Sequence, residues 1–155
     1  ICVAGGTGLA AVYQIARDFG TNDKPAHIFA GARTANRLYF IEDCKDIAQV
    51  TTATDDGTSG FKGRVTDALA DYLAELSPEA LSKLWFYNCG PAPMIHAAEK
   101  VQRDFGADQQ IFSAIDYTTK CGVGICGACA SPDGRRICID GPFINREPDL
   151  LPRLG

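Results

Sequence analysis

The chain has 155 residues, of which 46% are apolar and 22% are charged, and its formal net charge at pH 7 is −4. This length allows one domain with its own hydrophobic core, or one domain and a small appendage. The negative charge and the lack of a basic stripe argue against a nucleic-acid-binding protein. No apolar run approaches the length of a membrane-spanning helix, so we expect no membrane span.

Hydrophobic patterning predicts strands that alternate with helices. The expected strands cover residues 1–6, 26–32, 47–53, 83–90 and 109–116. Apolar residues at helical spacing predict helices over 9–19, 65–76 and 91–105, together with a short polar helix over 35–43 and a turn-rich loop over 54–63. Such an alternation forms right-handed βαβ units. We therefore expect an α/β fold that is Rossmann-like: an open, parallel, five-stranded sheet with helices on both faces.

The composition changes at about residue 116, where helical periodicity gives way to glycines, cysteines and short β-like pieces. We therefore expect one domain over residues 1–115 and a small, cysteine-rich, β-containing domain over residues 116–155. In the larger domain, Trp85 is expected to anchor the core.

The smaller domain contains four cysteines with the spacing C-x4-C-x2-C-x8-C, namely Cys121, Cys126, Cys129 and Cys138. The first three match the plant-type [2Fe–2S] pattern, C-x4-C-x2-C followed by a later cysteine. Gly122, Gly124 and Gly127 permit the tight turns that bring backbone N–H groups toward the sulfurs of a cluster. The spacing therefore favours a [2Fe–2S] cluster with these four cysteines as the metal ligands.

Zinc and a disulfide are the alternatives for these thiols. Structural zinc sites prefer two C-x2-C pairs, or cysteines combined with histidine, and neither His27 nor His96 is near the four cysteines in the sequence. Seven cysteines, with four in one cluster, are not typical of a secreted disulfide scaffold. We therefore expect a reduced, cytoplasmic protein in which His27, His96, Cys2 and Cys44 have no functional role.

A glycine-rich turn, Gly5-Gly6-Thr7-Gly8, follows the first strand and begins the first helix. From Gly6 onward it fits G-x-G-x-x-A, a form of the dinucleotide-binding fingerprint, although an ordinary strand-to-helix turn is the alternative. Glycines let a pyrophosphate approach the backbone, and a helix N-terminus favours its negative charge. The second strand ends in Gly31-Ala32-Arg33, without an acidic residue to hold a ribose hydroxyl. Since Arg33 either favours a 2′-phosphate or faces solvent, the choice between NAD and NADP stays open.

Taken in order, these blocks resemble a known family. The chain is similar to the C-terminal part of the electron-transfer subunits of dihydroorotate dehydrogenase B, which belong to the ferredoxin–NADP reductase superfamily and carry a C-terminal [2Fe–2S] domain. The resemblance covers nearly the whole chain and rests on "AGGTGLAAV", "GARTANRLYF", "TDDGTSGFKGRVTD", "YNCGPAPM", the cysteine loop and "DGPFINREPDL".

The resemblance implies a set of site residues for a pyridine nucleotide in residues 1–115. Gly5, Gly6, Thr7 and Gly8 would face the pyrophosphate, Asp55, Asp56 and Gly57 would border the nucleotide site, and Cys89, Gly90 and Pro91 would lie beside the nicotinamide. For the last three, a buried strand cysteine followed by a helix start is the alternative. The resemblance also implies that the four cysteines of the smaller domain ligate the cluster, and that no side chain acts as an acid, base or nucleophile.

Two features depart from the family pattern. The glycine run lacks the proline that is common after it, and no block resembles the flavin-contacting strand of the family's N-terminal FAD-binding β-barrel. NAD(P)H gives a hydride, whereas a [2Fe–2S] cluster accepts one electron, so a flavin is needed between them. Because the chain begins at Ile1, inside an expected strand, we expect the FAD domain to lie on a preceding segment or on a separate chain.

The function that the resemblance implies is electron transfer by an oxidoreductase subunit. Electrons would pass from NAD(P)H through FAD and the cluster to a partner, which in the dihydroorotate enzymes holds FMN and serves pyrimidine biosynthesis, so a hetero-oligomer is expected. The equivalent subunit of a sulfide dehydrogenase, a ferredoxin–NADP oxidoreductase or a cytosolic hydrogenase is one alternative. A non-enzymatic Rossmann-like sensor with a structural zinc ion is an alternative of another class.

Overall fold

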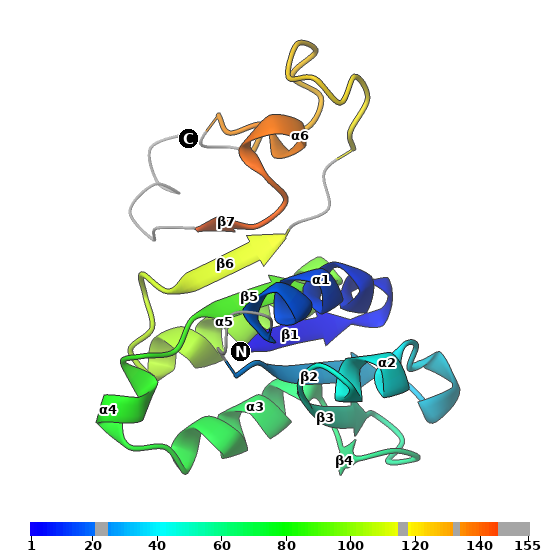
Figure 1. Cartoon of the computed structure of the whole chain (residues 1–155), viewed down its shortest axis with the longest axis vertical. Coiled ribbons are helices and arrows are strands. Elements are labelled where there is room, and N and C mark those ends of the chain that lie inside the picture. The colour runs from blue at the N-terminus through cyan, green and yellow to red at the C-terminus, as the bar shows by residue number, and fades with distance from the viewer. Residues whose placement is uncertain (21–24, 115–117, 132–133, 146–155) are drawn as a thin grey trace.

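The computed structural model describes residues 1–20, 25–114, 118–131 and 134–145, and its centre is a seven-stranded sheet of order β4-β3-β2-β1-β5-β6-β7 (Figure 1). The strands are β1 (Cys2–Gly5), β2 (His27–Ala32), β3 (Gln49–Thr54), β4 (Phe61–Lys62), β5 (Phe86–Cys89), β6 (Ile111–Ala114) and β7 (Ile144–Asn145). Neighbouring strands pair in parallel, except that β6 and β7 pair antiparallel. The predicted α/β class and Rossmann-like order are confirmed.

The prediction of five parallel strands is wrong in number, because a two-residue strand is added at each edge of the sheet. β4 arises inside the predicted loop over 54–63 and pairs through Ala53↔Phe61 and Thr54↔Lys62. β7 comes from the cysteine-rich part of the chain and pairs through Ser113↔Ile144. Two residues are too few to show an alternating pattern, so hydrophobic periodicity does not detect such strands.

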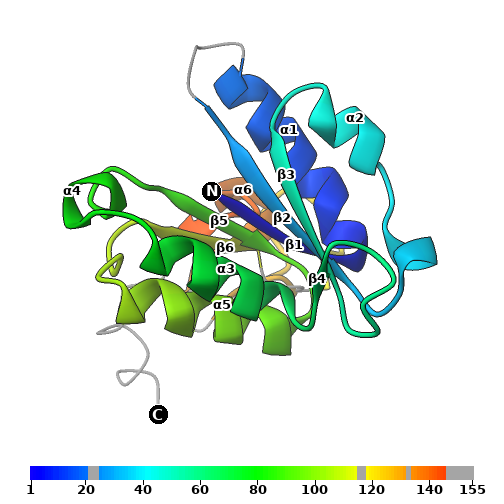
Figure 2. The same ribbon diagram turned by 90° about the horizontal axis from the view of Figure 1, so that it is seen from below.

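Helices cover both faces of the sheet (Figure 2). The 3-10 helix η1 (Gly6–Gly8) leads into α1 (Leu9–Gly20), which lies with α2 (Ile41–Lys45) on one face. The other face carries α3 (Val65–Ala74) and α5 (Ala92–Asp104), and the short α4 (Pro78–Leu81) follows α3. The helices predicted over 9–19, 65–76 and 91–105 are confirmed to within a few residues.

Alternate residues of the inner strands feed two separate cores. Val3 and Phe29 pack in the core beneath α3 and α5, whereas Cys2 and Ala4 pack in the core beneath α1 and α2. This follows from the period of two in a strand, and it explains why strands covered on both faces are apolar throughout. Burial raises the pKa of Cys2 to about 11, and Cys44 is also fully buried, so both are core residues.

The helix predicted over residues 35–43 is wrong. Residues Ala35–Arg37 form a separate 3-10 helix, η2, and α2 begins only at Ile41. Between them, Phe40 has a φ of 53°, in the left-handed region. An α-helix of L-residues does not continue through that conformation, so the segment divides there.

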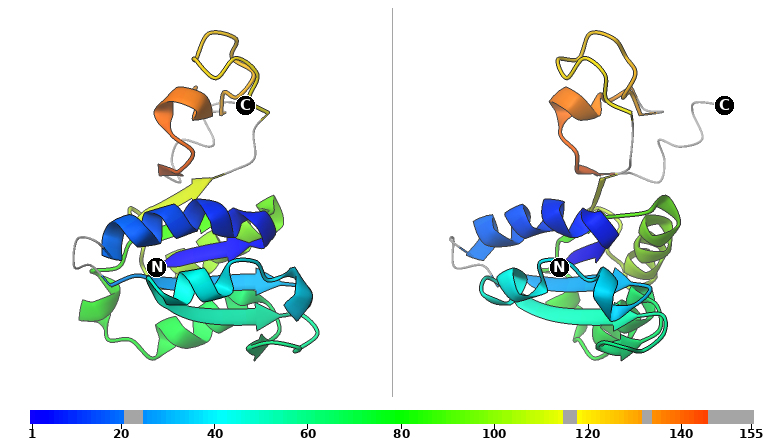
Figure 3. Two further views of the ribbon diagram at one scale, coloured as in Figure 1. Left: turned by 45° about the vertical axis from the view of Figure 1, so that its right-hand side comes forward. Right: turned by 90° about the vertical axis from the view of Figure 1, so that its right-hand side faces the viewer.

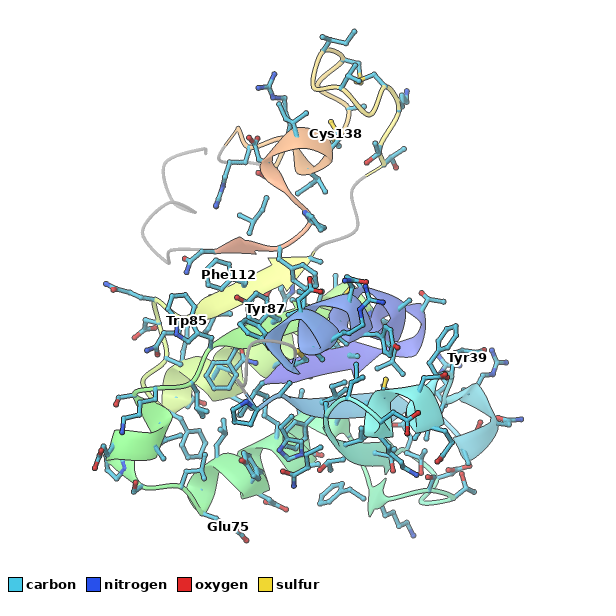
Figure 4. The ribbon with its side chains drawn as sticks, viewed as in Figure 1. Tyr39, Glu75, Trp85, Tyr87, Phe112 and Cys138 are labelled. Carbon is cyan, nitrogen blue, oxygen red and sulfur yellow. The ribbon has the colours of Figure 1, made fainter. Side chains whose placement is uncertain are left out.

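The expectation that Trp85 anchors the core is also wrong. Trp85 precedes the first residue of β5, at the amino edge of the sheet, and its side chain is 51% exposed. Its ring stacks on Phe112, with 5.7 Å between the ring centroids, and Phe112 stacks in turn on Tyr87 (Figure 4). The indole thus extends an aromatic stack along one sheet face rather than filling the interior.

One of the two histidines is buried and the other is exposed. His27 is buried between Phe29 and Tyr72, and its Nε2 lies 2.8 Å from the hydroxyl of Thr51. Burial lowers the pKa of His27 to about 4, so the ring is neutral at pH 7. His96 is exposed on α5.

The cysteine-rich segment lies beyond the β7 edge of the sheet (Figures 1 and 3). The short helix α6 (Ile137–Asp140) connects the cysteine loop to β7, and an isolated bridge pairs Ala130 with Arg136. The predicted domain boundary at residue 116 and the end of the block "DGPFINREPDL" fall outside the described residues, so the division into two domains stays a prediction. Within the described ranges, every helix is too short or too polar to cross a membrane.

Candidate functional site

A pocket lies where the strand order of the sheet reverses. The carboxyl ends of β1, β2, β3 and β5 share one edge, and β2 and β5 lie on opposite sides of β1. Open α/β sheets bind ligands in the crevice at such a switch point. Here the pocket has a volume of about 590 Å³.

Five of the ten residues predicted for the nucleotide site line this pocket, namely Gly5, Gly6, Thr7, Asp55 and Pro91. Gly6 has a φ of 55°, a conformation that favours glycine. A Cβ on Gly5 would lie 2.6 Å from the sulfur of Met94 and 2.9 Å from Cδ of Pro91. Gly5 therefore packs against the start of α5, whereas the exposed Gly6 leaves the backbone of the turn accessible, as a bound pyrophosphate requires.

Three more of the predicted residues, Gly8, Cys89 and Gly90, lie directly behind the lining. A Cβ on Gly8 would lie 2.2 Å from the carbonyl oxygen of Cys89, and a Cβ on Gly90 would lie 2.9 Å from the backbone nitrogen of Gly5. The turn after β1 and the turn after β5 therefore touch backbone to backbone. Because glycine has no side chain, it lets the two strand ends approach this closely at the switch point.

The remaining two predicted residues, Asp56 and Gly57, lie in the loop between β3 and β4 and outside the lining. The carboxylate of Asp56 accepts hydrogen bonds from the hydroxyl of Thr58 at 2.6 Å and from its N–H at 3.0 Å. These bonds hold the pKa of Asp56 below its usual range, and the bond from the hydroxyl has the larger effect. Asp56 and Gly57 (φ 75°) thus shape the loop beside Asp55 rather than the pocket itself.

Several lining residues are given no role by the glycine motif or by the family resemblance. They come from the segment after β2, the start of α3 and the start of α5, and they include Arg37, Tyr39, Arg64, Thr66, Pro93 and Met94. Arg33, whose role the sequence left open, also lines the pocket. Their common signal is the family resemblance, because all of them lie in the quoted blocks "GARTANRLYF", "TDDGTSGFKGRVTD" and "YNCGPAPM", although no role was assigned to them.

The second site consists of the four predicted metal ligands, which lie together beside α6 in two pairs. The thiol of Cys126 donates a hydrogen bond to the sulfur of Cys121, and the thiol of Cys138 donates one to the sulfur of Cys129. Cys121 is also close enough to Cys129 and Cys138 for their charges to interact. Cys129 is 2% exposed and Cys126 is exposed, so the site has a buried side and an open side.

Backbone N–H groups point at these sulfurs. Hydrogen bonds lower the pKa of Cys121 to about 6, and the bond from the N–H of Val123 has the largest effect. The N–H and the thiol of Cys126 and the N–H of Ile125 contribute the rest. The N–H of Cys138 likewise lowers the pKa of Cys129. Donors of this kind favour the thiolate, which is the form that binds a metal.

Glycines make this arrangement of donors possible. Gly122 and Gly124 have φ values of 73° and 77°, so the loop turns back on itself between the first two cysteines. The N–H of Gly124 donates to the sulfur of Cys138, which joins the loop to α6. A Cβ on Gly124 would lie 2.6 Å from Cδ1 of Ile139, so the loop packs closely on that helix.

The donor set fits a binuclear cluster. A [2Fe–2S] cluster takes four thiolates, two on each iron, and the structure offers two pairs of thiols with N–H groups directed at the sulfurs. Nowhere in the described ranges do three His, Cys, Asp or Glu side chains converge as ligands of a single ion. The four thiols are instead arranged as two pairs, which matches the two ligands that each iron of a binuclear cluster requires.

Together, the fold and the two sites define a dinucleotide-binding oxidoreductase domain joined to an iron–sulfur site. Residues 2–100 match the oxidoreductase NAD-binding domain, and residues 118–148 match the iron–sulfur cluster binding domain of dihydroorotate dehydrogenase B. The chain belongs to the oxidoreductase NAD-binding family and carries the cluster-binding domain of the dihydroorotate dehydrogenase B type. The predicted family resemblance is thereby confirmed.

Curated relatives agree with this assignment. The chain is 33% identical over 159 residues to a probable dihydroorotate dehydrogenase B (NAD(+)) electron transfer subunit of Methanocella arvoryzae, covering 100% of this chain and 58% of the relative. It is 33% identical over 162 residues to a homolog of that subunit from Thermotoga maritima, covering 100% of this chain and 55% of the relative. The chain therefore spans little more than half the length of these relatives.

Solved structures show the same fold. The structure of an NADH-dependent reduced ferredoxin-NADP oxidoreductase matches 99% of this chain and 55% of its own, with a TM-score of 0.78 and 29% identity. A ferredoxin reductase in carbazole 1,9a-dioxygenase matches 68% of this chain and 33% of its own, with a TM-score of 0.57 and 28% identity.

Proposed function

We propose that this chain is the nucleotide-binding and cluster-holding part of an electron-transfer subunit. Electrons would pass from NAD(P)H through FAD to a [2Fe–2S] cluster, and from there to a partner protein. The observation that carries this proposal is the arrangement of four cysteines as two thiol pairs beyond the edge of a sheet with a dinucleotide-type switch point. The names of the relatives, which are electron transfer subunits, support it.

The residues of the pocket have binding roles in this proposal. Gly5, Gly6 and Thr7 hold the pyrophosphate at the start of η1, and Gly8 lets β1 and β5 meet. Cys89, Gly90 and Pro91 border the nicotinamide, while Asp55, Asp56 and Gly57 form the loop at the other rim. The residues position a nucleotide and carry out no acid–base chemistry, since hydride transfer occurs between cofactors.

The four cysteines have the role of holding the cluster. Cys121 pairs with Cys126, and Cys129 pairs with Cys138, so each pair would supply two thiolate ligands to the cluster. A [2Fe–2S] cluster accepts and gives one electron at a time, whereas NAD(P)H gives two together. FAD would accept the two electrons together and release them singly. We assign the FAD to the part of the relatives that this chain does not span.

The partner that we propose is an FMN-containing dehydrogenase subunit such as that of dihydroorotate dehydrogenase B, in a cytoplasmic hetero-oligomer that serves pyrimidine biosynthesis. Val123 and Ile125, on the cluster loop, are 63% and 83% exposed, and exposed apolar side chains beside a redox centre suit a protein partner.

A second candidate keeps the chemistry and changes the partner. The similarity to an NADH-dependent reduced ferredoxin-NADP oxidoreductase, at a TM-score of 0.78, supports the corresponding subunit of that enzyme class. Sulfide dehydrogenases and cytosolic hydrogenases remain further alternatives of the same kind. Co-purification of the tagged chain from its native cells, followed by identification of the bound subunit and its flavin, separates these partners.

The experiment that tests the proposed function compares two reductants on the flavin-free chain. The cluster-loaded protein is mixed anaerobically with NADH or NADPH, and separately with dithionite, while the visible absorption of the cluster is recorded. We expect dithionite to bleach the cluster and the nucleotides to leave it oxidised until a flavin is added, because a hydride donor needs a two-electron acceptor. Rapid bleaching by NADH or NADPH without flavin would contradict the proposed electron path.

A further inference from the structure

Three arginines line the switch-point pocket, and their charges are not balanced there. Arg33 follows β2, Arg37 ends η2, and Arg64 precedes α3, and all three are exposed. The ion pairs found among the described residues involve none of them. Asp55 is the one acidic side chain in the described lining. The pocket is therefore built for a ligand with more negative charge than the pyrophosphate turn alone accommodates.

The position of Arg33 relates it to the ribose end of a bound dinucleotide. Gly5, at the glycine turn, pairs in register with Gly31 on β2, and Arg33 follows two residues later. Neighbouring strands lie about 4.8 Å apart, so the end of β2 is one strand spacing from the pyrophosphate turn. In dinucleotide-binding sheets this is where the adenosine ribose lies. An acidic residue there accepts the 2′-hydroxyl of NAD, whereas an arginine accommodates the 2′-phosphate of NADP.

Neither nearby carboxylate lies on β2 itself, where a dinucleotide-binding sheet carries the acidic residue, although Asp55 lines the pocket beside Arg33. Asp55 follows β3, one strand further from the glycine turn, and its backbone N–H donates to the carbonyl oxygen of Ala32 at 3.1 Å. The carboxylate of Asp56 is engaged by Thr58 and lies outside the lining. The end of β2 thus presents guanidinium groups where a 2′-hydroxyl would need an acceptor.

The outer part of the pocket completes a site for adenosine. Tyr39 lines it from the segment after η2 and is 46% exposed, so its ring has a free face for a purine (Figure 4). Aromatic side chains and guanidinium planes both stack on bases. Arg37 and Tyr39 come from the same segment, which places a cation and an aromatic ring on one side of the pocket.

We infer that this pocket selects a dinucleotide with a 2′-phosphate on its adenosine, that is NADP(H) rather than NAD(H), and that Arg33 and Arg37 hold this phosphate; the inference rests on the proposed function. A phosphomonoester carries roughly −1.5 to −2 charge near pH 7 and has three acceptor oxygens. Guanidinium groups bind such oxygens in pairs. Arg64 adds a third positive charge to the same pocket. The names of the curated relatives specify NAD(+), so the test below compares the two dinucleotides directly.

The test uses adenosine bisphosphates, which need no flavin and no cluster. The purified chain is titrated by calorimetry with 2′,5′-ADP, with its isomer 3′,5′-ADP and with 5′-AMP. We expect 2′,5′-ADP to bind at least about tenfold more tightly than either of the others, since only it offers the phosphate to both arginines. NADP⁺ should exceed NAD⁺ by a similar factor.

Charge-removing variants separate a specific site from general attraction. Arg33→Gln and Arg37→Gln should each abolish most of the preference for 2′,5′-ADP over 5′-AMP. Arg17→Gln removes the same charge from an exposed position in the last turn of α1 and should leave the preference unchanged. Thermal unfolding of each variant confirms that the fold is intact.

The possible failures are distinguishable. If 2′,5′-ADP binds no better than 5′-AMP while NAD⁺ still binds, the 2′-phosphate inference is overturned and the nucleotide site stands. If Arg17→Gln reduces the preference as much as Arg33→Gln, the effect is nonspecific and the inference is again overturned. If no adenine nucleotide binds, the nucleotide role in the proposed function fails, and the inference fails with it.

Discussion

Arg136 is the residue that links the two segments bearing the cluster cysteines. Its guanidinium donates through Nη1 to the carbonyl oxygen of Gly124, in the cysteine loop, at 2.6 Å. Its backbone N–H donates to the carboxylate of Asp140 at 2.5 Å, which closes α6 around Cys138. The N–H of Ile137 reaches the carbonyl oxygen of Cys129 at 3.2 Å. Arg136 therefore holds the ligand geometry and brings a positive charge to the site.

We predict that Arg136→Gln lowers the reduction potential of the cluster. Reduction adds negative charge, which a nearby cation stabilises, and the loss of a few tenths to 1.4 kcal/mol corresponds to about 10–60 mV for one electron. The variant should also lose its cluster several times faster in the presence of an iron chelator. An EPR-monitored redox titration measures the first effect and the decay of visible absorption measures the second.

Arg135→Gln is the matched control, because it removes the same charge one residue earlier. Arg135 donates through Nη2 to the carbonyl oxygen of Asn145, on β7, at 2.7 Å, whereas Arg136 donates to Gly124 in the cysteine loop. A smaller change in potential and in chelation rate is therefore expected. Equal changes in the two variants would show that Arg136 has no particular role at the site.

At the scale of the elements, the junction between η1 and β5 determines whether the switch point forms. Gly8 and Gly6 are two residues apart, but their surroundings differ. A Cβ on Gly8 would lie 2.2 Å from the carbonyl oxygen of Cys89, whereas a Cβ on Gly6 would meet nothing within 4 Å. Gly6 instead has a φ of 55°, so a side chain there strains only the backbone.

We predict that Gly8→Ala destabilises the protein more than Gly6→Ala. The first forces β1 and β5 apart and should lower the free energy of unfolding by roughly 2–3 kcal/mol, as overpacking does. The second should cost about 1–2 kcal/mol, the price of a left-handed residue with a side chain. Urea unfolding followed by far-UV circular dichroism measures both, and equal losses would contradict the close contact at Gly8.

Long elements were predictable from the sequence, and short ones were not. The apolar spacing of α1, which begins at Leu9, and the apolar run of β5 signal their structure locally. β4 and β7 have two residues each and form only because a longer strand is already in place. Phe40 ends the predicted helix over 35–43 by a left-handed φ, which nothing in the residue type indicates.

In the candidate sites too, contiguous motifs were predictable from the sequence, and residues that come from separate segments were not. The glycine turn and the four cysteines are contiguous motifs, so spacing identified them. Tyr39 and Arg64 lie in blocks that carry the family resemblance, but they reach the pocket from separate segments, so their role there depends on the order of the strands. The exposure of Trp85 likewise depends on the position of the strand edge, since a tryptophan near an apolar strand is more often buried.

The whole molecule places its two sites on different parts of the fold, with the nucleotide pocket at the carboxyl edge of the central strands and the cysteines beyond β7 (Figure 3). An electron path between them has meaning only if the cysteines hold a redox-active cluster. Cys121, Cys126, Cys129 and Cys138 therefore carry the central claim.

The most direct measurement is the metal and sulfide content of the anaerobically purified protein, together with its EPR spectrum after reduction by dithionite. A [2Fe–2S] site requires about two iron atoms and about two acid-labile sulfides per chain, and a paramagnetic signal that appears on reduction. Substitution of Cys129 by serine should lower both contents. A colourless protein with one zinc ion, no sulfide and no EPR signal would contradict the electron-transfer function.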